Sequence, residues 1–235
     1  MEARKTNEKI IIIDNFDHLI KYMGKFRKTS IYNFRGQSNK DWKLIPKAGR
    51  PPFEEKDDKM LFMHWKRRAT AYLKRDIYDE WELLAIAQHN GIPTRLLDWT
   101  HNPLVAAFFA CMDNFDTDGA IFAYKSTTYI ETKSKDPFNF PNGTIKFFMP
   151  TASSDRIMNQ LGYFTLHSQP TKELTEKIEN TVLEKIIIPH GIKKEIIFAL
   201  NQFGINSLTL FPDLDGLTKH LTWFYTNYKY WDDTI

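Results

Sequence analysis

The sequence predicts a single α+β domain, in which short strands form a sheet that is flanked by helices. Two observations predict this class. Helical and strand-like segments alternate along the whole chain, and no internal repeat, low-complexity tract or Gly/Ser linker divides its 235 residues. A chain of this length can bury a sizeable core without disulfide bonds. We therefore expect residues 1–235 to fold as one domain.

Hydrophobic periodicity and turn residues place the individual elements. Asp14 is expected to cap the first helix, and Gly36 to end the first strand. Gly91 provides a left-handed helix cap, and Pro93 prevents the helix from continuing. The expected strands lie at residues 31–34, 96–100, 119–126, 144–149, 163–167, 183–188 and 207–211. The expected helices lie at residues 16–23, 53–78, 80–90, 104–112, 155–161, 192–203 and from 212 onward.

The helix over residues 104–112 begins at Asn102-Pro103, where the cap residue and the first-turn proline stand in the expected order. Its residues are apolar on all sides, so we expect it to be the buried centre of the core. Cys111 lies in this run and should pack as a small hydrophobic residue rather than react as a thiolate.

Charge and hydropathy exclude several classes of protein. The formal net charge is +3, from 32 basic and 29 acidic side chains, which is too balanced to predict nucleic-acid binding. A basic stripe at Lys66-Arg67-Arg68 and Lys74-Arg75 keeps a nucleic-acid-binding or nuclease module as a weaker alternative to a solvated helix face. The sequence contains no run of about 18 apolar residues, so it predicts no membrane span. A single cysteine fits a reducing compartment, so we expect a cytoplasmic protein.

The first candidate site lies at the end of the first strand. Arg35 stands between Phe34 and Gly36, and the polar Gln37 follows. A guanidinium group at a strand end, beside backbone that a ligand can approach closely, fits a phosphate clamp because its planar fork matches phosphate oxygens. The alternative is an arginine at the surface or in an ion pair.

The second candidate site is the run from Gln88 to Thr100, which concentrates polar groups between an apolar helix and an apolar strand. Such groups must be satisfied or functional. His89 can act as acid, base or ligand, or as a partner for the helix end. Asp98 can act as a base, or as an ion-pair partner of Arg35 or Arg95.

Neither run matches a zinc spacing, a phosphate-binding glycine loop, a nucleophile elbow or a dinucleotide fingerprint, so we predict no metal site. A third polar group contains Arg156, Asn159 and Gln160, with Phe164, Thr165 and His167 close behind. It either faces the same site or forms an ordinary helix surface.

The chain resembles the FRG domain family of bacteria and phages, and the motif of that name stands here as Phe34-Arg35-Gly36. The resemblance is strongest in Gln88-His89, in the run from Gly91 to Thr100 and in the run from Asn102 to Ala110. It returns at Leu210-Phe211-Pro212-Asp213 and covers nearly the whole chain from Tyr32 to Leu221.

A more distant similarity links the same residues to ADP-ribosyltransferases of the arginine, serine, glutamate type. This resemblance implies a split β-sheet core that binds NAD, in which Arg35 holds the NAD phosphates and Asp98 to Thr100 line the nicotinamide side. The implied NAD-binding residues are Phe34, Arg35, Gly36, Gln37, Gln88, Thr94, Arg95, Thr100 and Gln160. The implied catalytic residues are His89, Asp98 and Glu184, although Glu184 stands one residue out of phase with the glutamate of those transferases, and such a shift reverses the face of a strand.

The resemblance therefore implies an ADP-ribosyltransferase-like enzyme that cleaves NAD, as a toxin or a defence effector against phages. The alternative is a domain of the same architecture that senses NAD or a related nucleotide without turning it over. The sequence does not indicate a macromolecular acceptor.

Overall fold

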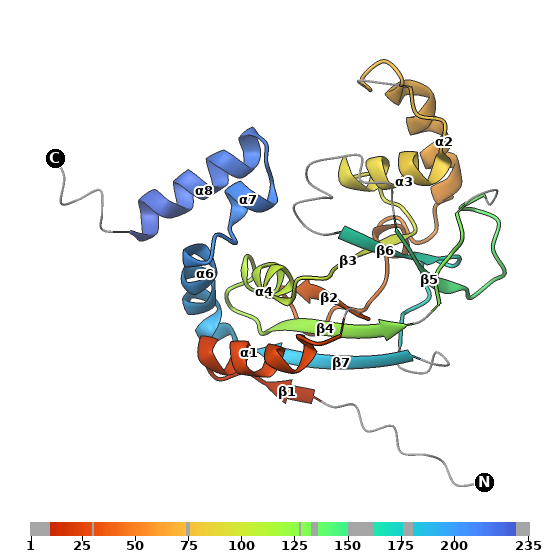
Figure 1. The fold of residues 1–235 in the computed structure, drawn as a ribbon. Helices are drawn as coiled ribbons and strands as arrows, with labels where there is room; N and C mark the ends of the chain where they lie inside the picture. Colours follow the sequence, from red (N-terminus) through yellow and green to blue (C-terminus); the bar gives the residue numbers. More distant parts are fainter. Residues whose placement is uncertain are drawn as a thin grey trace, which may run out of the picture.

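The computed structural model describes residues 10–29, 31–73, 76–126, 128–132, 136–149, 162–175 and 181–228. Their strands form one sheet in the order β1-β7-β4-β2-β3-β6-β5 (Figure 1). The strands are β1 Ile10–Ile12, β2 Tyr32–Gln37, β3 Leu96–Thr100, β4 Gly119–Ser126, β5 Ile145–Phe148, β6 Gly162–His167 and β7 Thr181–Ile188. The α-helices are α1 Phe16–Met23, α2 Asp58–Ala69, α3 Glu80–His89, α4 Pro103–Cys111, α6 Lys193–Gln202, α7 Ser207–Leu210 and α8 Leu214–Asn227. The α+β class is confirmed, and none of the described helices is long and apolar enough to cross a membrane.

The junction between β2 and β3 is the weakest pairing inside this sheet. β2 pairs with β4 over six residues, from Tyr32 opposite Lys125 to Gln37 opposite Ala120. It pairs with β3 at one position only, Phe34 opposite Thr100. We call this junction the seam, because it separates the β1-β7-β4-β2 part of the sheet from the β3-β6-β5 part.

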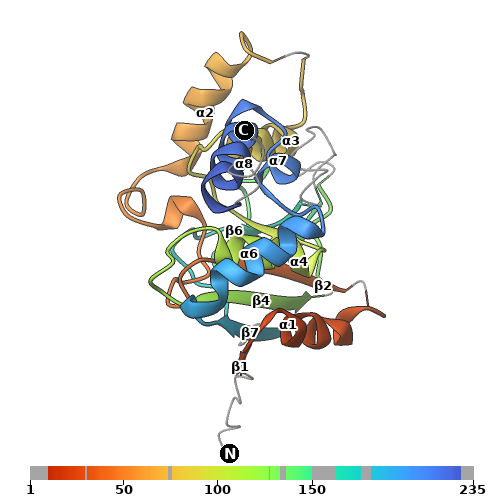
Figure 2. The same cartoon turned by 90° about the vertical axis from the view of Figure 1, so that its left-hand side faces the viewer.

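Helices cover the same face of the sheet on both sides of the seam (Figures 1 and 2). α1, α4 and α6 pack on β2, β4 and β7 and form the largest cluster of buried apolar residues. α2 and α3 pack on β3, β5 and β6 and form a second cluster. The end of α3 and the side of α4 therefore face each other above the seam.

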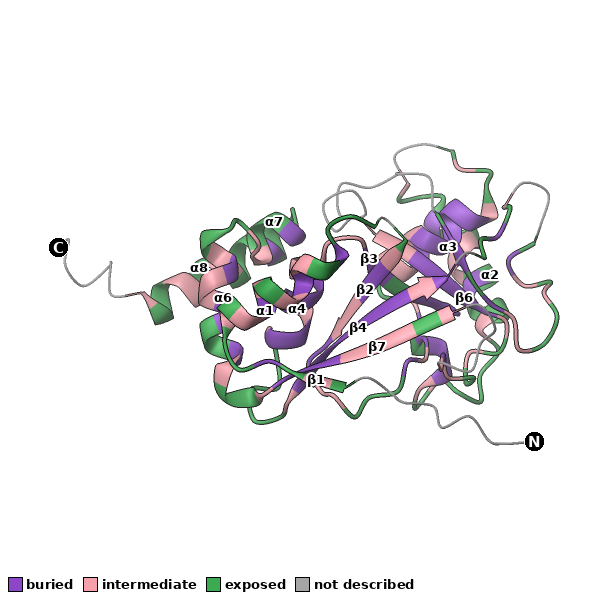
Figure 3. Cartoon of the chain, turned by 60° about the horizontal axis from the view of Figure 1, so that its bottom comes forward, coloured by how far each residue is buried: buried purple, intermediate pink, exposed green. Residues whose placement is uncertain are grey.

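The opposite face of the sheet is covered by loops. Its buried side chains include Leu97, Trp99, Phe122 and Tyr124, and the central strands are buried along most of their length (Figure 3). The segment 38–50 covers this face, and the backbone N–H of Leu174 donates to a carbonyl of that segment, Leu44 O, at 3.0 Å.

α4 is the buried helix that the sequence predicts. Between residues 104 and 111 every side chain is buried except Leu104 and Phe109, which are half-buried. Cys111 is fully buried, and its burial raises the pKa of the thiol to about 12, so it packs and stays protonated. The close approach of α4 to the sheet occurs at Gly36, where an added Cβ would lie 1.8 Å from Ala106 O.

Some predicted element boundaries are wrong. Asn15 caps α1 in place of Asp14, because its Oδ1 accepts from His18 N at 2.8 Å. Gly36 does not end β2; the strand continues to Gln37, since the pairing with β4 persists to that residue.

The helix expected at 53–78 is shorter and begins after Asp57, whose side chain accepts from Met60 N at 3.0 Å. The strand expected at 207–211 is the short helix α7. Asn206 and Thr209 form a capping box at its start, with Asn206 Oδ1 accepting from Thr209 N at 3.1 Å. β1 was not predicted; it is an edge strand parallel to β7. The helix expected at 155–161 lies outside the described residues.

Gly36→Ala should lower the free energy of unfolding by about 3 kcal/mol or more, because the new methyl group meets backbone of α4 that no side-chain rotation can move. Gly204→Ala is the matched control: its φ is +74° and nothing lies within 4 Å of the new Cβ. The free energy of unfolding of that variant should fall only by the cost of placing alanine in a left-handed conformation, about 1–2 kcal/mol. Urea unfolding of both variants measures the difference, and equal losses would contradict the close approach.

Candidate functional site

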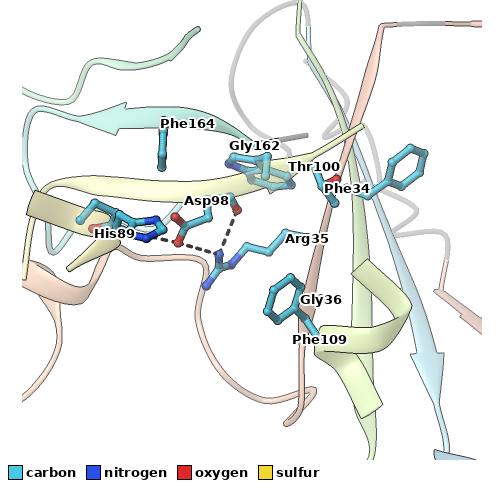
Figure 4. A pocket seen from close by; sticks show the side chains of 11 residues that line it. Phe34, Arg35, Gly36, His89, Asp98, Thr100, Phe109, Gly162 and Phe164 are labelled. Carbon is cyan, nitrogen blue, oxygen red and sulfur yellow. Dashed lines mark hydrogen bonds and ion pairs between the residues drawn. The ribbon is translucent and has the colours of Figure 1, made fainter. Parts of the chain in front are cut away.

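A pocket of about 270 Å³ opens at the seam (Figure 4). β2, α3, β3, α4 and β6 all contribute to it. It is lined by Phe34, Arg35, Gly36, Gln88, His89, Asp98, Trp99, Thr100, Phe109, Gly162 and Phe164. The two separate runs that the sequence singles out, around Arg35 and from Gln88 to Thr100, are therefore brought together in one place.

Arg35 reaches from β2 across the seam to β3. Its Nη1 donates to the backbone oxygen of Asp98 at 2.9 Å and lies 3.6 Å from Asp98 Oδ2. The side chain of Arg35 is 16% exposed, whereas that of Asp98 is 55% exposed. Burial lowers the pKa of Arg35 to about 10, and Asp98 opposes this shift. The guanidinium therefore remains charged at neutral pH.

One edge of the Arg35 guanidinium group is not used by Asp98. The Nε atom is buried and has no hydrogen-bond partner among the residues that the structure describes. The Nε–Nη2 edge presents two parallel N–H groups, which is the arrangement that binds two oxygens of a phosphate or carboxylate. Arg35 thus keeps a second pair of donors, Nε and Nη2, while Nη1 binds the backbone of β3.

Gln88 holds the carboxylate of Asp98 from the other side. Its Nε2 donates to Asp98 Oδ2 at 3.0 Å, and its Oε1 accepts from Thr94 Oγ1 at 2.6 Å. The hydroxyl of Thr94 also accepts from Leu96 N at 3.2 Å, so its own hydrogen is left for Gln88. Thr94 thereby fixes which way the Gln88 amide faces. Thr94 is buried and does not line the pocket, so its part in the site is to position Gln88.

The remaining pocket residues supply a titratable group and apolar walls. His89 enters from the end of α3. The Oγ1 of Thr100 accepts from Asn102 N at 3.1 Å and so supports the start of α4. Phe109 and Phe164 form aromatic walls of the pocket. The sequence places Phe109 in the buried helix and Phe164 behind the third polar group, and assigns neither a binding role.

Arg95 is a structural residue, which corrects its prediction as a ligand-binding one. Its Nε and Nη2 each donate to a carboxylate oxygen of Asp58 at 2.8 Å, and both side chains are about nine-tenths buried. The Phe138 ring lies 4.3 Å from the guanidinium carbon. The second guanidinium of the predicted site therefore fastens α2 to the sheet. Gln37 also lies outside the pocket lining and is buried.

Glu184 does not line the pocket. It stands on β7 opposite Ala123 and accepts a hydrogen bond from the Tyr22 hydroxyl at 2.9 Å. Lys25 forms an ion pair with the same carboxylate oxygen. The predicted catalytic contribution of Glu184 therefore has no support in the geometry of this pocket. Gln160 lies outside the described residues, among which no three His, Cys, Asp or Glu side chains gather as a metal site.

A buried hydrogen-bond chain supports the floor of the pocket. Trp99 Nε1 donates to Thr165 Oγ1 at 3.0 Å, and Thr165 Oγ1 lies 3.2 Å from His167 Nε2. His167 Nδ1 lies 3.0 Å from Lys172 O, so Nδ1 carries the proton and Nε2 accepts from Thr165. Burial lowers the pKa of His167 to about 4, which keeps the imidazole neutral.

The matched segment of the chain covers most of this pocket. Residues 30–119 match the FRG domain family. This match supports the resemblance to the FRG family and includes the pocket residues from Phe34 to Phe109, whereas Gly162 and Phe164 lie beyond it. No curated protein and no solved structure matched the chain.

The fold should lose stability as the pH falls from about 6.5 to about 4. The unfolded chain binds a proton at His167 in this window and the folded chain does not, so acid favours unfolding. The shift from 6.5 to about 4 corresponds to a loss of about 3 kcal/mol at most. Urea unfolding at pH 7 and pH 4.5 measures it. His167→Asn should show a smaller loss over this range, and an unchanged loss would assign the pH dependence to other groups.

Proposed function

We propose that the pocket binds NAD and that the protein cleaves the bond between nicotinamide and ribose, as an ADP-ribosyltransferase-like enzyme. The observation that supports this most is the pairing of Arg35 with Asp98. A charged, buried guanidinium with an unused donor edge stands beside a half-exposed carboxylate that Gln88 holds in place. The first group fits an anion, and the second fits a developing positive charge.

Arg35 would bind the pyrophosphate. A buried guanidinium binds phosphate oxygens more strongly than an exposed one, because less water competes for its N–H groups. The contact between Nη1 and Asp98 O fixes the plane of the fork before a ligand arrives. Preorganisation of this kind lowers the entropic cost of binding.

Asp98 would act at the reacting carbon. When the glycosidic bond breaks, its electron pair leaves with nicotinamide, and positive charge develops on the ribose ring. A carboxylate at the pocket surface stabilises that charge. Water or an acceptor nucleophile then adds to the same carbon and releases a proton. With water, the products are nicotinamide, ADP-ribose and one proton. His89 lines the same pocket and would take that proton.

The second candidate is a domain that binds a nucleotide without cleaving it. The position of Glu184 favours this reading, because its carboxylate is engaged by Tyr22 and Lys25 outside the pocket. A nucleic-acid-binding module has less support, since Lys66 of the basic stripe pairs with Glu80. A role as toxin or phage-defence effector is part of the enzyme proposal and has no separate structural support.

Release of nicotinamide from NAD tests the enzyme proposal. Asp98→Asn should lower the rate at least about 100-fold, because the neutral amide does not stabilise the developing charge. Glu184→Gln is the matched control: it removes an acid on the same face of the sheet and should leave the rate unchanged. NAD binding without nicotinamide release would support the sensing domain. If both variants lost the same fraction of the rate, the proposed role of Asp98 at the reacting carbon would be refuted.

Arg35→Lys tests the clamp separately from the chemistry. Lysine keeps the charge but loses the planar fork, so NAD affinity should fall about tenfold or more, equivalent to about 1.4 kcal/mol. Calorimetric titration measures the affinity, and thermal unfolding of the same sample reports whether the fold is intact. A stable variant with unchanged affinity would refute the clamp.

A further inference from the structure

Three alternate residues of β2 form a polar row on the face of the sheet opposite α4. They are Asn33, Arg35 and Gln37, which stand opposite Tyr124, Phe122 and Ala120 of β4. Asn33 is fully buried and Gln37 is 3% exposed. The buried side-chain nitrogen and oxygen atoms that have no hydrogen-bond partner in the described chain all belong to this row: Asn33 Nδ2 and Oδ1, Arg35 Nε, and Gln37 Nε2 and Oε1.

The row contrasts with the other buried polar groups nearby. Thr165 and His167 face the same layer, and both take part in the hydrogen-bond chain that begins at Trp99. A buried amide without a partner costs stability, because it gives up its bonds to water and gains none. The β4 residues opposite the row, Tyr124, Phe122 and Ala120, belong to the apolar cluster of this layer. A carboxamide at residue 37 is therefore not explained by the packing of this layer.

Gln37 lies beside the pocket. Arg35 belongs to both the row and the pocket lining, and Gly36 lines the pocket between Arg35 and Gln37. From Phe34 onward β2 has no further pairing with β3, so no strand backbone closes the seam next to Gln37. Asn33 stands on the other side of that single pairing, beyond the end of β3.

The backbone around Gln37 is fixed, which leaves its side chain as the part that can move. The carbonyl of Ser38 accepts from the buried Lys193 Nζ at 2.6 Å, and Lys40 N donates to Asp118 O at 2.7 Å. The side chain of glutamine has three rotatable bonds, so its amide can change direction, and it stands on the same face of β2 as Arg35, two residues away.

We propose that Gln37 and Arg35 form a subsite for the ribose phosphate part of the nucleotide. Arg35 Nε and Nη2 face phosphate oxygens, and the Gln37 carboxamide pairs with a ribose hydroxyl, which donates and accepts as the amide does. This inference rests on the proposed nucleotide binding and adds a residue whose buried amide is otherwise unpaired.

Gln37→Met tests the subsite, because methionine has a similar shape and no hydrogen-bonding group. Without ligand, the variant should melt about 2–4 °C higher, since it removes unpaired polar atoms from the core. Its affinity for ADP-ribose and for ribose 5-phosphate, measured by calorimetric titration, should fall about tenfold. Asn33→Leu is the matched control from the same row: it should also melt higher but bind both compounds as the unchanged protein does.

The outcomes separate this inference from the proposed function. If the unchanged protein binds ADP-ribose and Gln37→Met binds it equally well, the subsite is refuted and nucleotide binding stands. A lower melting temperature for Gln37→Met would show that the amide serves the fold, which also refutes the subsite. If the unchanged protein binds neither ADP-ribose nor ribose 5-phosphate, both proposals fail together.

Discussion

The contact between Arg35 and Asp98 crosses the one interior junction that a single residue pair holds among the strands the structure describes. On one side of this seam, α4 packs so closely on β2 that no Cβ fits at Gly36. On the other side, the Thr94 and Gln88 hydrogen bonds fix Asp98. The guanidinium joins these two rigid halves at the floor of the pocket. The shape of the pocket therefore depends on the side chain of Arg35, on the packing of α4 against β2, and on the hydrogen bonds that fix Asp98.

Much of the fold could be predicted from local sequence. β3 and β4 lie where alternation and turn residues place them, and α4 begins at the cap and proline that the sequence shows. Two of the errors concern short elements. Residues 207–210 carry β-compatible side chains, but the capping box of Asn206 and Thr209 makes them helical. β1 lies in a run of four isoleucines, Ile10 to Ile13, which is a local strand signal that the prediction overlooked. Only its parallel pairing with β7 depends on the tertiary fold.

The site could be predicted in part, because polar residues that follow buried elements must be satisfied or functional. That reasoning selected Arg35, His89 and Asp98, and the structure places all three around one pocket. It could not distinguish Arg35 from Arg95, since the difference lies in a distant partner, Asp58, in α2. It placed Phe109 in the buried helix and Phe164 behind the third polar group but assigned neither a binding role, because the aromatic walls of a pocket resemble other core residues until the tertiary fold brings them together.

The single pairing between β2 and β3 also has a mechanical consequence. The two parts of the sheet are joined by one residue pair and resist twisting against each other poorly. Side chains that bridge the seam therefore stiffen the sheet. Arg35 is such a side chain, and a bound molecule that contacts both Arg35 and Asp98 would add another bridge. Substitutions at this junction therefore cannot change the pocket alone; each also changes how firmly the two parts are held in register.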